Sequence, residues 1–229
     1  MPNTELAGRL QETRRKIAST AQDAGRNPDD IKLIAVSKTR TAEEVRTACE
    51  AGQRAFGENR IQEIEEKAPA LPEDCEWHMI GHLQRNKVKS ALDYVSWIHS
   101  VDSERLLNRI ERIAAEKSRR ITVLLQVNMS GEESKYGLRP EGAPRLLEKA
   151  LECSQVDCKG LMTMAPFGAD AAELHRVFGG LRELRDRLQA EFATPLPELS
   201  MGMTSDFETA IREGATLVRI GTAIFGPRG

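Results

Sequence analysis

Residues 31–44, with the sequence IKLIAVSKTRTAEE, contain the pattern that decides the fold of this chain. The run 31–36 is short and apolar except for Lys32, which is typical of a strand covered on both faces of a parallel sheet. A polar junction with Lys38 follows at once, and Thr41 and Glu44 then match a capping box that opens a helix. The stretch predicts one β/α unit with Lys38 on the rim of its core, although on this stretch alone a solvated lysine is the simpler interpretation.

The same alternation of short apolar runs and longer amphipathic segments continues along the chain. The predicted strands cover 31–37, 54–58, 76–81, 96–101, 121–128, 158–164, 198–202 and 217–226. Seven helices separate these eight strands, and one more helix, near residues 4–24, precedes them. Eight units in 229 residues come close to the ~250 residues of a typical (β/α)8 barrel.

We therefore expect an α/β fold, a (β/α)8 TIM barrel that forms a single domain over residues 1–229. No helix is predicted after the last strand, so the extra N-terminal helix is expected to cover that gap. An open doubly wound sheet is the alternative. Its dinucleotide-binding version is disfavoured, because no GxGxxG motif follows any of the predicted strands.

Composition and charge exclude several classes of function. The formal net charge of -2 provides no chain-wide positive field for nucleic acid, and glutamates interleave the basic segment 104–120 as on a solvated helix face. No apolar run reaches the ~18 residues that a membrane span needs, and residues 1–16 lack the apolar core of a signal peptide. We expect a cytoplasmic protein without nucleic-acid or membrane partners, whose four cysteines are free thiols.

Polar residues at the carboxyl ends of barrel strands meet at one mouth, where barrel enzymes place their chemistry. In chain order these residues are Lys38, Glu58, Asn59, His82, Gln84, Ser100, Asp102, Asn128, Thr163, Ser200 and Arg219. His82 is expected to stack near a ligand or to bond a loop. A metal site at His78 and His82 is conceivable, but the strand pattern places His78 inside and no HExxH motif is present, so none is expected.

Two stretches near the last two strands suit a phosphate group. Residues 200–206, SMGMTSD, combine hydroxyl groups with the start of a helix, and Gly221 and Thr222 lie within the last predicted strand, 217–226. The hydroxyl groups alone are equally consistent with helix capping. Barrels often bind phosphate after strands seven and eight, so the joint occurrence favours a phosphate site.

A phosphate site together with Lys38 suggests a phosphorylated aldehyde held as a Schiff base, with pyridoxal 5'-phosphate as the leading candidate. Schiff-base formation needs an unprotonated amine. Desolvation, or a nearby cation such as Arg219, would lower the pKa of Lys38 accordingly.

Several motifs resemble, in the same order, those of the pyridoxal phosphate homeostasis proteins, also called the YggS or PROSC family. They are AVSKT, FGEN, WHMIGHLQRNK, SVDS, QVN, GLMTMAP, SMGMTSD and VRIGTAIFG, which together extend from about residue 31 to 226. The resemblance implies a barrel similar to the N-terminal domain of bacterial alanine racemases. It also implies that the cofactor is bound on Lys38.

By the same resemblance, Arg219 faces the pyridine nitrogen and Asn59 lies near the ring. The phosphate is held by Ser200, Met203, Gly221 and Thr222, partly through backbone amides, and Thr204 is a further expected cofactor-binding residue. Two positions depart from the family pattern. Thr204 stands where the family often has serine, which keeps a hydroxyl group, and Arg60 stands where an aromatic residue is usual, which changes the rim beside Asn59.

The residues also bear on whether the protein is an enzyme. An arginine at the pyridine nitrogen accepts no proton, so the ring is a weak electron sink, which racemases nevertheless tolerate. A racemase needs a second acid/base group, and the only tyrosines are Tyr94 and Tyr136, the latter in the polar loop 130–142. We expect a monomeric carrier or buffer of pyridoxal phosphate that passes it to apoenzymes. A slow single-domain amino-acid racemase, or a barrel enzyme that never meets the cofactor, are the alternatives.

Overall fold

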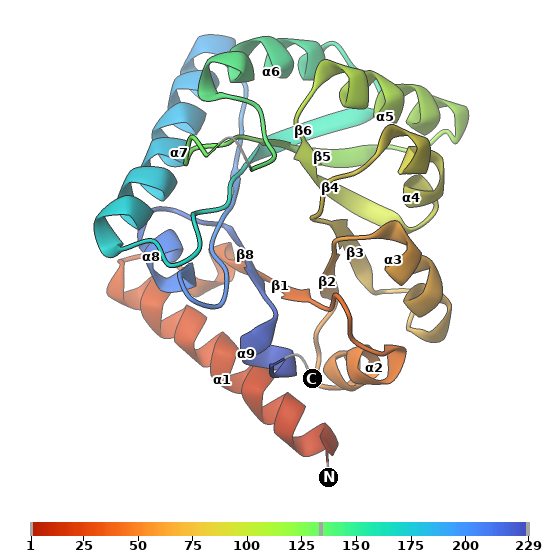
Figure 1. Cartoon of the computed structure of the whole chain (residues 1–229), viewed down its shortest axis with the longest axis vertical. Helices are drawn as coiled ribbons and strands as arrows, with labels where there is room; N and C mark the ends of the chain where they lie inside the picture. Colours follow the sequence, from red (N-terminus) through yellow and green to blue (C-terminus); the bar gives the residue numbers. More distant parts are fainter. Residues whose placement is uncertain (1, 133–134, 228–229) are drawn as a thin grey trace.

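The computed structural model describes residues 2–132 and 135–227, and within them eight parallel strands close into a barrel in sequence order (Figure 1). The strands are β1 (Lys32–Val36), β2 (Ala55–Glu58), β3 (Glu76–Met79), β4 (Val95–Val101), β5 (Ile121–Gln126), β6 (Val156–Met162), β7 (Glu198–Ser200) and β8 (Leu217–Ile220). Closure occurs where β1 pairs with β8, with Leu33 beside Val218. The predicted (β/α)8 barrel is therefore confirmed.

Helices surround the barrel on its outside (Figure 1). They are α1 (Pro2–Asp23), α2 (Ala42–Glu50), α3 (Ile61–Lys67), α4 (Val88–Tyr94), α5 (Glu104–Glu116), α6 (Ala143–Leu151), α7 (Ala171–Phe192), α8 (Phe207–Arg212) and α9 (Thr222–Phe225), with short 3-10 turns η1 (Pro28–Asp30), η2 (Ala68–Ala70), η3 (Arg85–Lys87) and η4 (Pro140–Gly142). The predicted capping box is present. The Thr41 hydroxyl accepts from the Glu44 amide at 3.2 Å, and the Glu44 carboxylate accepts from the Thr41 amide at 2.8 Å.

The last predicted strand, 217–226, was too long. Strand β8 ends at Ile220, and residues 222–225 form the short helix α9. A run of four residues is too short for its apolar pattern to separate a helix turn from a strand. Helix α1 packs against α9, α8 and α2, so α1 and α9 together cover the gap that α1 alone was expected to cover (Figure 1).

The apolar core has two parts. The larger part lies between the strands and the outer helices and includes Phe56 and Phe178, both fully buried. The smaller part is separate and consists of Leu124, Met162 and Leu217 with Trp97 and Met164 packed against them. Alternate residues of each strand point to opposite faces, so this smaller cluster fills the inside of the barrel.

The described residues also bear on two expectations from composition. None of the helices in this part of the chain is long and apolar enough to cross a membrane. All four cysteines are free thiols, as predicted, although the Sγ atoms of Cys49 and Cys75 lie 3.3 Å apart.

Candidate functional site

Strand pairing places three segments side by side at the carboxyl end of the barrel. Val36 of β1 is in register with Gly57 of β2, so Lys38 lies level with Asn59, two residues further along each strand. On the other side of β1, Ala35 pairs with Ile220 of β8, just before α9 begins. Lys38 therefore lies between the ends of β2 and β8, the arrangement that the sequence predicted.

A buried ionic cluster fixes the backbone on the amino side of Lys38. The Ser37 hydroxyl donates to Glu58 Oε1 at 2.6 Å, and the Lys67 ammonium donates to the same oxygen at 2.8 Å and to the Ser37 carbonyl at 2.9 Å. Glu58 is fully buried and Lys67 is 3% exposed. Burial raises the pKa of Glu58, while the hydrogen bonds from Lys67 and Ser37 oppose that shift. Glu58 therefore orients the segment that carries Lys38.

The backbone on the carboxyl side of Lys38 is held in an unusual conformation. Thr39 has a φ of 63°, in the left-handed region that β-branched residues rarely adopt. Its amide donates to Glu63 Oε2 at 2.6 Å, and Glu63 in turn accepts from Lys67 at 2.9 Å. One lysine thus links the contacts on both sides of Lys38. Such strain, on the order of 1–3 kcal/mol, persists only where neighbouring contacts determine the geometry.

The sequence analysis did not identify Lys67 and Glu63 as parts of the site. Their spacing of four residues is that of an ordinary ion pair on a helix surface. One feature of the sequence does point to Lys67. Residues 61–67 contain few apolar side chains, and the buried face of α3 consists of Ile61, Ile64 and Lys67. A lysine on the same helix face as two buried isoleucines is expected to be buried and therefore to need an ion-pair partner.

A chain of polar side chains crosses the inside of the barrel. The Arg219 guanidinium donates to Ser200 Oγ at 2.6 Å, and that oxygen lies 2.8 Å from His99 Nδ1. His99 Nε2 lies 2.9 Å from His78 Nδ1, and His78 Nε2 lies 3.6 Å from the carboxylate of Glu76. The chain runs from the amino end of β3 to the carboxyl ends of β7 and β8.

The two ends of this chain determine the proton positions within it. Arginine only donates and carboxylate only accepts, so a consistent chain has Ser200 donating to His99 and His99 donating to His78. Both imidazoles then carry their proton on Nε2. The opposite arrangement would direct an unprotonated His78 nitrogen at the Glu76 carboxylate, which is repulsive. Burial lowers the pKa of both His78 and His99, so both rings are neutral.

Arg219 is the buried cation of the site, at 4% exposure. Arg219 donates to Ser200 and also to the Thr163 carbonyl at 2.9 Å. These two hydrogen bonds together fix the plane of its guanidinium group. Burial lowers the pKa of Arg219 to about 10, while the nearby Asp206 carboxylate opposes the shift. Arg219 is still charged at neutral pH and offers donors only.

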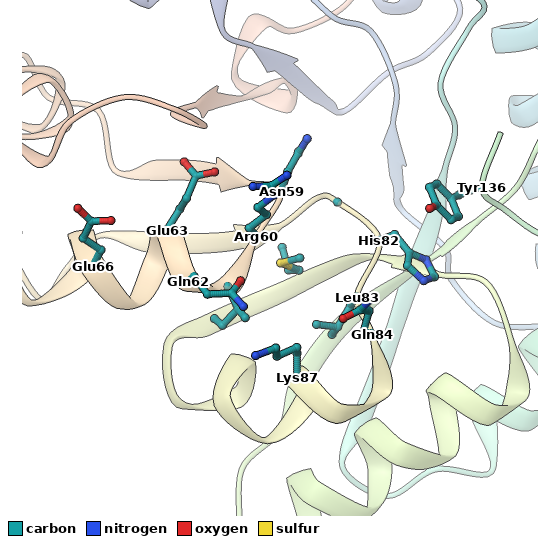
Figure 2. Close-up of a pocket in the computed structure, with 13 residues that line it drawn as sticks. Asn59, Arg60, Gln62, Glu63, Glu66, His82, Leu83, Gln84, Lys87 and Tyr136 are labelled. Atoms are coloured by element: carbon teal, nitrogen blue, oxygen red, sulfur yellow. The ribbon is translucent and has the colours of Figure 1, made fainter. Parts of the chain in front are cut away.

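A pocket of about 690 Å³ lies beside the ends of β2 and β3, and we call it the mouth pocket (Figure 2). Lys38, Ser200 and Arg219 are not among the residues that line it. Asn59 and His82 both line it, as does Lys87. The ring of His82 stacks on the ring of Tyr136, with centroids 4.4 Å apart and planes inclined by 13°. This contact is with a loop tyrosine, so the expected stacking of His82 near a ligand stays a prediction; residues 133–134 of that loop lie outside the described residues.

The segment between β7 and α8 differs from the predicted phosphate cradle. The Met203 amide donates to Asp206 Oδ1 at 2.6 Å, and the amides of Asp206 and Phe207 donate to the Met203 carbonyl. These amides are therefore already paired within the segment. Thr204 lines a different hollow, between α1 and α8. The Asp206 carboxylate, three residues after Met203, accepts from the Met203 amide and thereby stabilises this turn.

The turn after β8 keeps the features that the sequence suggested. A Cβ atom on Gly221 would lie 3.1 Å from the Val36 carbonyl, so glycine allows β8 to end close against β1. Thr222 is exposed at the start of α9. Among the predicted residues, strand register thus brings the backbones of Lys38, Asn59 and Gly221 together. A hydrogen bond joins Ser200 and Arg219.

Within the described ranges, no three histidine, cysteine, aspartate or glutamate side chains are grouped so that they could hold a metal ion. His78 is fully buried in the barrel and bonded to His99, which explains its position without a metal.

Comparison with known proteins gives consistent results over nearly the whole chain. The family model described as alanine racemase, N-terminal domain, matches residues 9–229. A protein of Aquifex aeolicus (strain VF5) named pyridoxal phosphate homeostasis protein is 44% identical over 221 residues, which are 96% of this chain and 97% of the relative. A Pseudomonas aeruginosa protein of the same name is 42% identical over 224 residues, or 97% of this chain and 96% of the relative.

A solved structure is similar to this chain to a comparable extent. PipY of Synechococcus elongatus PCC7942, solved with pyridoxal phosphate (PLP) bound, has a TM-score of 0.84 and 40% sequence identity with this chain. The match covers 96% of this chain and 100% of PipY.

Proposed function

Because this chain belongs to the pyridoxal phosphate homeostasis proteins, within the alanine racemase N-terminal-domain family, we propose that it binds pyridoxal 5'-phosphate and takes part in the control of this cofactor inside the cell. In this proposal Lys38 holds the cofactor as a Schiff base. The protein stores and releases the cofactor without turning over a substrate.

The donor set at the mouth fits this cofactor. The cofactor supplies an aldehyde, which condenses with a primary amine and releases one water molecule. Lys38 supplies that amine at the end of β1. Support comes from the fixed backbone around it: Glu58 accepts from the Ser37 hydroxyl, Glu63 accepts from the Thr39 amide, and Lys67 donates to the Ser37 carbonyl. A fixed segment keeps the amine in one place before the cofactor arrives, which lowers the entropy cost of binding.

The single observation that carries the carrier proposal is the buried, hydrogen-bonded guanidinium of Arg219. It donates to Ser200 and Thr163, and its lowered pKa of about 10 still leaves it charged at neutral pH. If Arg219 faces the pyridine nitrogen, it donates a hydrogen bond there and leaves the nitrogen unprotonated. The ring then withdraws electrons weakly, which suits storage better than carbanion chemistry.

The predicted contacts to the phosphate are not all supported to the same extent. Gly221 and Thr222 are the best candidates, because Gly221 allows close backbone approach and Thr222 is exposed at the mouth side of α9. Ser200, Met203 and Thr204 stay predictions. The Ser200 hydroxyl is shared with His99 and Arg219, the Met203 amide bonds Asp206, and Thr204 lines the hollow against α1.

Chemical trapping tests the Schiff base directly. The protein is incubated with pyridoxal phosphate, reduced with borohydride and digested, and the modified lysine is identified by mass spectrometry. We expect the adduct on Lys38 and its loss in Lys38→Ala. Lys87→Ala is the matched control, since Lys87 is a lysine that lines the mouth pocket and should not affect labelling. An adduct on Lys87, or labelling that survives in Lys38→Ala, would contradict the proposal.

A slow amino-acid racemase is the second candidate, and one observation favours it. The Tyr136 ring stacks on His82 at the mouth, where a phenol is available as an acid/base group. The loaded protein is incubated with L-alanine and with D-alanine in heavy water, and exchange at Cα is followed by NMR. The carrier proposal predicts exchange no faster than with free cofactor. Faster exchange that is lost in both Lys38→Ala and Tyr136→Phe would establish the racemase instead.

A further inference from the structure

Three arginines of α5 share one face of the helix. Arg105, Arg109 and Arg112 are spaced by four and three residues, which places them in a stripe ~10 Å long. Arg85 of η3 faces this stripe, and the four arginines with Asn86 and Asn108 line a groove of about 490 Å³. We call this the arginine groove.

The groove contains positive charge that the described part of the chain leaves largely unneutralised. No carboxylate of the described residues lines it. Of its four arginines, only Arg112 forms an ion pair within the described part of the chain, with Glu116 at 3.8 Å. The other two glutamates of α5, which were expected to interleave with these arginines, point elsewhere. Glu104 pairs with Arg145 at 3.5 Å, and Glu111 accepts hydrogen bonds from backbone amides at 154–156.

The arginine groove is continuous with the mouth of the barrel. A hollow of about 510 Å³ lies between them and shares His82, Leu83 and Gln84 with the mouth pocket (Figure 2). At its other end the same hollow shares Arg85, Asn86 and Arg105 with the arginine groove. A molecule that lies in the groove is therefore next to the mouth.

We propose that the arginine groove docks a carboxylate-rich surface segment of a partner protein. Like charges that line one groove repel one another, and an acidic segment relieves this repulsion while each guanidinium offers two parallel donors to a carboxylate. The stripe is longer than one small anion, so it matches several carboxylates in a row. On the basis of the proposed function, the partner is an apoenzyme that takes the cofactor from the adjacent mouth.

Nucleic acid fits the groove less well. Single strands bind on aromatic side chains that stack with bases, and the residues that line the groove include no aromatic ring. The chain also has a formal net charge of -2, so no chain-wide positive field adds to the charge of this groove. Both features favour a short acidic protein segment.

The test uses a fluorescently labelled polyglutamate peptide of about eight residues, which in extended form exceeds the length of the stripe. Fluorescence anisotropy measures its binding to the full-length protein, to the double variant Arg85→Glu with Arg105→Glu, and to the control Arg120→Glu with Arg187→Glu. All four residues are exposed, so the two variants change the net charge equally and neither disturbs the core.

We expect the Arg85/Arg105 variant to bind the peptide at least about tenfold more weakly, because two attractive contacts become repulsive. The control should bind as the unaltered protein does, and added salt should weaken binding. Equal binding by both variants, no binding at all, or tighter binding of inorganic phosphate or of a DNA oligonucleotide with the same charge would overturn the proposal.

Cofactor loading of the same proteins is measured by absorbance in parallel. Loading should be equal in all of them, since the substituted residues do not line the mouth pocket. Peptide binding without loading would refute the proposed function and leave the groove as a docking site. Loading without peptide binding would refute the docking site alone.

Discussion

At the scale of single residues, Lys67 and Glu58 form a buried ion pair directly beneath the segment that carries Lys38. The Lys67 ammonium lies 2.8 Å from Glu58 Oε1, while Glu58 Oε2 is buried and has no hydrogen-bond partner. A buried pair of this kind adds little net stability, because both charges lose their hydration. Its consequence is geometric: it fixes the Ser37 carbonyl and hydroxyl.

Replacing Lys67 with methionine should be costly, because the change leaves the Glu58 carboxylate buried without its cation. We expect Lys67→Met to lower the free energy of unfolding by about 3–5 kcal/mol in urea titrations. Lys87→Met, at the mouth, should change it by less than about 0.5 kcal/mol. Adding Glu58→Gln to Lys67→Met should recover part of the loss. If Lys67→Met is as stable as Lys87→Met, the buried pair is not what holds the segment.

The histidines inside the barrel allow a second prediction at this scale. Burial lowers the pKa of His78 and His99, and the chain from Arg219 to Glu76 assigns both protons to Nε2. Long-range ¹⁵N NMR should therefore show two neutral Nε2–H rings that do not titrate between about pH 5 and 8. Exposed His175 provides the reference signal. A proton on Nδ1 of His99, or titration of either ring in that range, would refute the assignment.

At the scale of elements, the segments that follow β2 and β3 approach each other closely at the carboxyl end of the barrel. Gly81, just after β3, lies against the backbone of Asn59, just after β2. A Cβ atom at Gly81 would lie 2.4 Å from the Asn59 carbonyl oxygen and 2.6 Å from its Cα. Backbone atoms cannot move aside as a flexible side chain can, so a side chain here must separate the two strand ends.

We expect Gly81→Ala to destabilise the protein by about 2–4 kcal/mol, since the overlap is with backbone on both strands. It should also weaken cofactor binding, because Asn59 moves with its strand. The matched control is Gly8→Ala in α1, where no atom lies within 4 Å of the added carbon. There alanine should stabilise the helix by up to about 1 kcal/mol. Similar effects of the two substitutions on thermal unfolding would contradict this account.

At the scale of the whole molecule, the polar chain joins the two ends of the barrel. Glu76 and Lys32 form an ion pair at the amino end, and Arg219 lies toward the carboxyl end. Burial acts to raise the pKa of Glu76, but the His78 ring and the Lys32 ammonium outweigh it and lower the pKa to about 2. The contacts of Glu76 are therefore made by its charged form.

This shift has a defined effect on acid stability. The folded-state pKa of Glu76 is depressed from 4.5 to about 2. The contribution of this carboxylate to the free energy of unfolding is therefore complete above pH 4.5 and is lost as the pH falls toward 2. We expect a loss of about 2–3 kcal/mol over that range in urea titrations. Lys32→Met should raise the pKa of Glu76 and move the loss to higher pH. Lys149→Met, which removes an exposed pair with Glu152, is the control; identical acid profiles for the two variants would contradict the assignment.

Much of the fold could be predicted from local patterns, for identifiable reasons. The capping box at Thr41 and the buried runs at β1 and β5 depend on residues close in sequence, and they were predicted correctly. The stretch 217–226 was assigned wholly to a strand, because the turn at Gly221 depends on how β8 meets β1. The arginines of α5 were assigned to a mixed solvated face, because the partners of Glu104 and Glu111 lie far along the chain.

The sequence by itself determined the alternation of eight strands with helices, and with it the closed barrel and the position of Lys38 at a strand end. Both follow from the periodicity of apolar residues, which is a local property of the chain. Only the tertiary structure decided which polar groups meet: Lys67 beneath Lys38, His78 beside His99, and Asp206 on the amide of Met203. Hydrogen bonds between distant segments leave no period in the sequence, because each depends on one pair of atoms brought together by closure of the barrel.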